Sequence, residues 1–343
     1  MRIAVDVMGG DLGPGEMVPG ALQAAQEYGA DLVLVGNESS IRQCLSKIEG
    51  RWAEQVDIVH APSAISMDED PLSAVRHKRD SSLVVAARMV REGKAEAMVS
   101  AGSTGALVAA GPLVVGRLSG VSRPALATPV PTVDGACILL DVGANSDCTP
   151  EQLLEFATLG SVYASSLLGL DRPRVGLLSI GSEPSKGNAL TVAAHRLLAC
   201  SPVRFIGNVE SRSVPFGAAD VVVTDGFTGN ILLKSMEGVG IAVFDMVRQA
   251  AASSLRSKAG ALLMKPSLRK VKKRMDYSEY GGAPLLGLAG LVVKAHGSSD
   301  RKAFASAVRV TSDLLRSGMS DRMARAVADR GLSTILPNGG GLE

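Results

Sequence analysis

Short apolar segments alternate with longer amphipathic segments along almost the whole chain of 343 residues. Each apolar segment has the length of a buried strand, and the segment that follows it has helical spacing. This order favours a parallel sheet with right-handed crossovers and helices on both faces. The sequence therefore predicts the α/β class, as a three-layer α/β/α fold with a large, mostly parallel sheet. Strands are expected at residues 3–7, 31–35, 56–60, 97–100, 136–141, 175–180, 204–207, 219–224 and 290–294, with an irregular crossing at Pro124, Pro129 and Pro131.

These strands and helices are expected to form one catalytic unit over residues 1–336, as a single large sheet or as two lobes around one cleft. A protruding helical hairpin is expected at about 241–276, because apolar residues repeat at helical spacing on both sides of Gly260 and Pro266. The glycine-rich segment 337–343 is expected to be a disordered tail.

Composition restricts the class of protein further. Hydrophobic residues make up 46% of the chain and aromatic residues only 3%, so the core has to be aliphatic. A net charge of +2 is too balanced for a general nucleic-acid binder, and no nucleic acid is expected as a partner. Four widely spaced cysteines without a CxxC pair fit a reducing cytoplasm and argue against zinc ribbons and disulfide scaffolds. Because no signal peptide or membrane-spanning run is present, we expect a cytoplasmic protein.

Polar, glycine-containing loops follow six of the predicted strands. Ligands of parallel α/β sheets bind beyond the carboxyl ends of the strands, so these loops are expected to share one rim and one ligand cleft. Helix capping alone accounts for some of the polar residues, with Asn188 and Thr228 as examples. The candidates are Asp6, Gly9, Gly10 and Asp11; Gly102, Ser103, Thr104 and Gly105; Asp141 and Asn145; Glu183, Ser185, Lys186 and Asn188; Asp225, Thr228, Gly229 and Asn230; and, in the last loop, Lys294, His296, Gly297 and Ser298.

The loop after residues 175–180 is the centre of this prediction. Its sequence, GSEPSKGN, places Lys186 at the start of a helical pattern. Three features favour the binding of an anion at this loop: the unpaired N–H groups of the first helical turn, the helix dipole and the lysine. The alternative is an ordinary strand-to-helix turn with a solvated lysine.

Several well-known sites are not predicted. No GxGxxG follows the first strand, GSEPSKGN does not match GxxxxGK[ST], and the chain has no GxSxG elbow. These absences argue against a dinucleotide fingerprint, a P-loop NTPase and a Ser-His-Asp hydrolase. Asp6, Asp11, Asp141 and Asp225 could gather around Mg²⁺, but carboxylates at strand ends are also routine turn and cap residues, and we predict no metal.

A second informative segment lies between residues 256 and 274, where eight basic residues occur without an acidic one. An apolar tip at 261–264 ringed by these charges fits a hairpin that dips into an anionic membrane surface, and it would equally attract an acidic protein. The alternative is a solvated basic face over a dimer contact. Nucleic acid is disfavoured because no aromatic residues interleave the charges. The predicted contact residues are Leu262, Leu263, Met264, Lys265, Arg269, Lys270, Lys272 and Lys273.

Taken together, five motifs resemble the PlsX family of bacterial phosphate acyltransferases. AVDVMGGD, VSAGSTGAL, LLDVGAN, LLSIGSEPSKGN and VVTDGFTGN occur in this order over essentially the full length. The resemblance implies transfer of a fatty acyl group from acyl-acyl carrier protein to inorganic phosphate, giving acyl phosphate for phosphatidic acid and phospholipid synthesis. It also implies a fold like those of phosphotransacetylase and the isocitrate and isopropylmalate dehydrogenases, a homodimer, and peripheral association with the inner face of the cell membrane. A downstream glycerol-3-phosphate acyltransferase is a further expected partner, and no cofactor is expected.

Under this resemblance Lys186 and Asn230 are the predicted catalytic residues. Lys186 would offset the charge of phosphate, and Asn230 would donate to the carbonyl or to a phosphate oxygen. Backbone N–H groups near Gly102–Gly105 and Gly226–Asn230, with the Ser103 and Thr228 hydroxyls, would cradle phosphate. A general base is not required, because phosphate is already ionised, and the proton donor to the leaving thiol is not identified. Three rivals are a phosphotransacetylase using coenzyme A, a decarboxylating dehydrogenase of the same broad fold, and a non-catalytic membrane scaffold.

Overall fold

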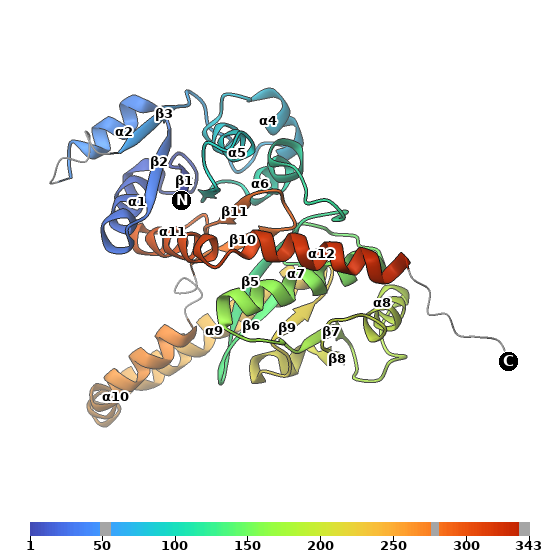
Figure 1. The fold of residues 1–343 in the computed structure, drawn as a ribbon. Coiled ribbons are helices and arrows are strands. Elements are labelled where there is room, and N and C mark those ends of the chain that lie inside the picture. The colour runs from blue at the N-terminus through green and yellow to red at the C-terminus, as the bar shows by residue number, and fades with distance from the viewer. Residues whose placement is uncertain (49–55, 276–280, 336–343) are drawn as a thin grey trace.

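The computed structural model describes residues 1–48, 56–275 and 281–335, which form one eleven-stranded sheet with helices on both faces (Figure 1). The α/β class and the large, mostly parallel sheet are confirmed. The strands are β1 (Arg2–Asp6), β2 (Asp31–Gly36), β3 (Asp57–His60), β4 (Ala97–Ser100), β5 (Ala125–Thr132), β6 (Gly135–Leu140), β7 (Val175–Ser179), β8 (Phe205–Glu210), β9 (Val221–Val223), β10 (Ala283–Leu286) and β11 (Leu291–Lys294), in the spatial order β3-β2-β1-β4-β11-β10-β5-β6-β9-β7-β8.

Several helices begin at residues whose side chains cap the first turn. Thr149 and Gln152 form a capping box around Pro150, and Asn188 and Asp225 each accept a backbone N–H from the first turn of the helix that they cap. The helices are α1 (Pro14–Tyr28), α2 (Glu38–Leu45), α4 (Pro71–His77), α5 (Ser82–Arg91), α6 (Thr104–Ala110), α7 (Pro150–Leu168), α8 (Ala189–Ala199), α9 (Gly226–Ala252), α10 (Leu255–Met275), α11 (Arg301–Arg316) and α12 (Met319–Ile335), with a π-helical turn η1 (Gly111–Val115) and a 3₁₀ turn η2 (Ser211–Phe216).

Two antiparallel strands in the middle of the sheet separate two parallel halves. The first half, β3 to β11, is parallel throughout; β10 is antiparallel to β11 and to β5, and β5 is antiparallel to β6. The second half, β6 to β8, is again parallel and therefore runs opposite to the first. In a sheet of fully overlapping strands, the carboxyl ends of two such halves would lie on opposite edges.

The register between β10 and β5 prevents this separation. Only Leu285 with Leu126 and Leu286 with Ala125 are paired, while Lys294 at the end of β11 pairs with Ala283. Leu140 at the end of β6 pairs with Ala127. Continuing this register places the ends of β11 and β6 about one residue apart along the strand direction, roughly 3 Å. The carboxyl ends of both halves therefore meet near the centre of the molecule.

Strand β5 corrects the sequence-based expectation of an irregular crossing. Proline disfavours a central strand, because it lacks the N–H that a sheet ladder uses. Only Ala125 and Leu126 of β5 pair with β10, so among the described strands the side of β5 away from β6 has no partner at Pro129 and Pro131. Proline is tolerated on such an edge. Strand β10 was not predicted from the sequence either.

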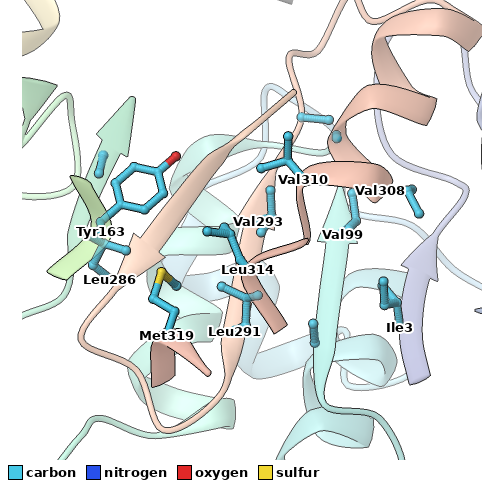
Figure 2. Close-up of a cluster of buried hydrophobic side chains, with 14 of the residues drawn as sticks. Ile3, Val99, Tyr163, Leu286, Leu291, Val293, Val308, Val310, Leu314 and Met319 are labelled. Atoms are coloured by element: carbon cyan, nitrogen blue, oxygen red, sulfur yellow. The ribbon is translucent and has the colours of Figure 1, made fainter. Parts of the chain in front are cut away.

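The core is aliphatic and lies on both faces of the sheet. Successive β1 residues alternate between two clusters, with Ile3 and Val5 on one face and Ala4 on the other. Figure 2 shows part of the first cluster, where Leu286 of β10 lies beside Tyr163 of α7 and Met319 of α12. Leu286 thus attaches the central strand to two helices.

Helices α9 and α10 pack on each other and extend away from the sheet (Figure 1). The turn between them is at 253–254, so the expected apolar tip at 261–264 is corrected: these residues lie inside α10, which continues through Gly260 and Pro266. Pro266 interrupts the backbone hydrogen bonding of α10. Because α10 is exposed there, this interruption disturbs few packing contacts. Within the described part of the chain, no helix combines the length and hydropathy needed to cross a bilayer. The expected tail at 337–343 lies outside the described residues.

Leu286→Ala is predicted to lower the free energy of unfolding by about 2–5 kcal/mol, because a fully buried leucine leaves a cavity beside α7 and α12. Leu72→Ala is the control, because Leu72 is 44% exposed and its truncation is expected to change stability by less than about 0.5 kcal/mol. Urea unfolding followed by circular dichroism measures both. Equal losses in the two variants would contradict the role given to β10.

Candidate active site

A cavity of about 600 Å³ opens where the two halves of the sheet meet. The first half contributes the start of α6 and the loop after β11, and the second half contributes the loop after β6 and the first turns of α9. Its floor is the part of β5 and β10 next to their two-residue pairing. The polar and charged lining residues are Thr104, Thr128, Asn230, Lys234, Glu237, Lys294, His296, Ser298, Ser299 and Asp300.

Close backbone contacts hold the loops of the first half together. A Cβ on Gly9 would lie 2.5 Å from the Gly102 nitrogen, so the loops after β1 and β4 can touch only because Gly9 has no side chain. Asp11 N–H donates to the Gly297 carbonyl at 2.8 Å, which joins the loop after β11. The buried Asp6 carboxylate accepts the Ser100 hydroxyl at 2.6 Å. Burial raises the pKa of Asp6, although these hydrogen bonds oppose the shift.

The loops of the second half are held in the same way. The buried Asp141 carboxylate accepts backbone N–H groups from Gly143 (3.2 Å), Ala144 (3.0 Å) and Asn145 (2.7 Å). Burial raises the pKa of Asp141. A Cβ on Gly229 would lie 1.9 Å from the Asp141 carbonyl oxygen, so α9 begins directly against this loop. The contact places Asn230, half-buried, over Gly143 at the cavity wall.

Of the candidate residues, those that line the cavity are Thr104, Gly105 and Asn230, together with Lys294, His296 and Ser298 of the last loop. Several other predicted residues cap helices or hold loops beside the cavity. Ser103, Asn188 and Asp225 cap α6, α8 and α9, and the Thr228 hydroxyl donates to Asp225 at 2.8 Å instead of facing the cavity as a free donor. The loop carrying Gly9, Gly10 and Asp11 packs behind the lining residues rather than among them.

The loop with Glu183, Ser185 and Lys186 lies outside the cavity lining and is exposed. Its backbone closes on itself, with Lys186 N–H donating to the Glu183 carbonyl at 3.0 Å and the Ser179 hydroxyl donating to the Lys186 carbonyl at 3.1 Å. The expectation of one rim shared by six loops is therefore corrected. Strand β9 separates β7 from β6, so the loop after β7 is displaced sideways from the point where the halves meet.

Two charged lining residues, Lys234 and Glu237, were not among the candidates from the sequence, and Lys294 and His296 were expected only as members of the last loop, without a role. Lys294 ends the buried strand β11 and is 9% exposed. Burial lowers its pKa to about 8, while Asp11 and Asp6 oppose the shift. Burial raises the pKa of Glu237, with His296 and Lys234 acting in the opposite direction. A lysine directly after three apolar strand residues was the available sequence signal for Lys294.

The four aspartates considered for Mg²⁺ do not form a ligand set. Across residues 1–48, 56–275 and 281–335, no three His, Cys, Asp or Glu side chains are grouped as metal ligands would be. Asp141 and Asp225 bind backbone N–H groups of their own loops.

Comparisons with known proteins agree with this arrangement. A family described as fatty acid synthesis proteins matches residues 1–322. A phosphate acyltransferase from Desulfitobacterium hafniense is 49% identical over 326 residues, covering 95% of this chain and 97% of its own. A phosphotransacetylase from Streptococcus pyogenes is similar in structure, with a TM-score of 0.63, 17% identity and coverage of 96% of this chain and 94% of that one.

A 4-hydroxythreonine-4-phosphate dehydrogenase from Salmonella typhimurium has a TM-score of 0.53 at 14% identity, covering 91% of this chain and 99% of that one. At such identities, likeness to a solved structure shows the fold alone, and it confirms the expected relation to phosphotransacetylases and dehydrogenase-like folds. The family match and the identity to curated relatives go further than the fold: this chain belongs to the PlsX family of phosphate acyltransferases.

Proposed function

We propose that the cavity brings inorganic phosphate against the thioester of an acyl-acyl carrier protein, and that residues 1–336 act as one catalytic unit. The product is acyl phosphate, which supplies phosphatidic acid and phospholipid synthesis. The observation that carries the proposal is a cavity lined from both halves of the sheet by Asn230, Thr104 and Lys294, in a chain of the phosphate acyltransferase family. Direct attack of phosphate on the carbonyl needs positioning and charge stabilisation, and no covalent enzyme intermediate.

Asn230 is suited to hold the reacting carbonyl. Its carboxamide is at the cavity wall in the first turns of α9, and the contact of Gly229 with Asp141 fixes the backbone beside it. An amide donor that is already in place costs no reorganisation when negative charge develops on the carbonyl oxygen. We assign this oxyanion contact to Asn230.

Lys186 supplies mobile positive charge from the neighbouring loop. Strand β7, which delivers it, is hydrogen-bonded to β9, and β9 leads into the helix that carries Asn230. Adjacent strands are about 5 Å apart, so a long side chain can reach across that distance. Among the described residues, Lys186 has no ion-pair partner within 4.0 Å. Its charge is thus available to a bound anion.

The direct test incubates the protein with acyl-acyl carrier protein and labelled inorganic phosphate. We expect labelled acyl phosphate to appear in step with loss of thioester. Acyl-coenzyme A is the matched donor, and faster turnover with it would favour the phosphotransacetylase alternative. Nicotinamide reduction would favour a dehydrogenase, and liposome binding without any loss of thioester would favour a scaffold.

Asn230→Ala is predicted to lower kcat by about 10²–10³, the range for removing one oxyanion donor. Lys186→Ala is predicted to lower kcat/KM by about 10², with most of the effect in the KM for phosphate, because it removes a counter-charge. Lys94→Ala removes an exposed lysine paired with Glu92 and is the control. Near-normal turnover of Lys186→Ala, in the same labelled-phosphate assay, would remove Lys186 from the mechanism.

The exposed surface of α9 and α10 is proposed to serve two contacts. Along α9, apolar side chains face solvent, which suits a second copy of the chain in a homodimer. On α10, Leu262 (69% exposed) and Leu263 (83% exposed) are close in sequence to Met264, Lys265, Arg269 and Lys270. This combination of apolar and basic side chains suits contact with the anionic inner face of the cell membrane or with the acidic carrier protein. Membrane contact would also bring acyl phosphate to a downstream glycerol-3-phosphate acyltransferase.

The pair Leu262→Glu/Leu263→Glu is predicted to abolish sedimentation with vesicles of anionic phospholipid, because two charges replace the apolar contact. Phosphate acylation in solution is expected to persist, since these residues lie outside the cavity lining. Leu113→Glu, at a residue of the turn η1 that is 48% exposed, is the control and should leave sedimentation unchanged. Survival of vesicle binding in the pair would show that α10 is not the membrane contact.

A further inference from the structure

The end of β11 places a buried lysine in the wall of the cavity. Lys294 is 9% exposed, and its ammonium donates to the carbonyl of the next residue, Ala295. Within the described residues it has no ion-pair partner at 4.0 Å or less. Burying an ammonium with so little compensation is costly, and such a group is retained where the charge or the proton is used.

Strand pairing explains how the charge is held at this position. Asp6 pairs with Ser100, and Ser100 pairs with Lys294, so the three residues form one row across β1, β4 and β11. Asp6 accepts the Ser100 hydroxyl and adds a negative field along the row, and Asp11 adds a second one. The other titratable groups around the cavity are Lys234, Glu237, His296 and Asp300.

We propose that Lys294 is the catalytic acid that protonates the thiolate released from the carrier protein. The inference rests on the proposed function, in which a phosphate oxygen attacks the thioester carbonyl. The new C–O bond forms, the C–S bond breaks, and its electron pair leaves on sulfur. The Lys294 ammonium gives its proton to that sulfur. The neutral amine then takes the remaining proton from the P–O–H of the acyl phosphate, so the proton of hydrogen phosphate ends on the thiol.

The proton affinity of Lys294 suits this transfer. Burial holds its pKa at about 8, close to that of an alkyl thiol at about 8.5. Catalysis by a proton donor is most effective when its pKa lies near the working pH, and an exposed lysine, at about 10.4, is too weak an acid. His296 is less suited, because it is exposed and its Nδ1 is 2.8 Å from the Ser298 hydroxyl.

The test compares wild type, Lys294→Met and Lys294→Arg with acyl-acyl carrier protein from pH 6 to 10. In wild type, kcat/KM is expected to fall above about pH 8, because the donor loses its proton there. Lys294→Arg keeps a positive charge that does not titrate in this range, so its lower rate is expected to show no fall near pH 8. Lys294→Met is expected to lose about 10² or more in kcat, the scale of general acid catalysis. Lys94→Met is the surface control and should keep the wild-type profile.

A second measurement separates proton donation from a structural effect. An acyl thioester of an aryl thiol needs no proton on its leaving group, so the loss in Lys294→Met should shrink to less than tenfold with that donor. Equal losses with both donors, or a wild-type pH profile in Lys294→Arg, would overturn the assignment. Wild-type protein that forms no acyl phosphate from labelled phosphate would instead reject the proposed function itself.

Discussion

The antiparallel pairing of β10 with β5 is the constraint on which the site depends. Two residue pairs, Leu285 with Leu126 and Leu286 with Ala125, join halves that run in opposite directions. A longer overlap would slide the halves past each other and move their carboxyl ends apart by about 3.4 Å for each added pair. Because the overlap is short, both sets of loops reach one cavity, and the unpaired part of β5 becomes its floor.

The loops around the cavity are fixed by backbone contacts more than by side chains. Gly9 against Gly102 and Gly229 against Asp141 are approaches that a Cβ would prevent. Two buried carboxylates, Asp6 and Asp141, then bind the hydroxyl and N–H groups of those loops. Most of the polar residues that follow the strands therefore make hydrogen bonds that hold the loops together. The few that face the cavity are held by a rigid frame, which is what electrostatic catalysis requires.

The sequence predicted the strands well where apolar runs were long. It did not predict β5, because proline has a low propensity for strands. Pro129 and Pro131 are tolerated in β5 because they lie where β5 has no partner strand on one side. The sequence predicted each loop of the site separately. Local patterns do not show that the strands of the two halves of the sheet run in opposite directions. The sequence therefore assigned a catalytic role to Lys186, whereas the strand register places Lys294 in the cavity wall.

Two lysines in different surroundings divide what the reaction needs. Under the proposed function, an exposed lysine such as Lys186 offers a positive charge on a flexible side chain that can follow a mobile anion. A buried lysine such as Lys294 gives up its proton readily, so it is a poor permanent counter-charge for phosphate. Attack by an anion requires the first property, and departure of a thiolate requires the second. Lys294 is suited to the second task and not to the first, because the burial that eases its proton release also weakens its hold on charge.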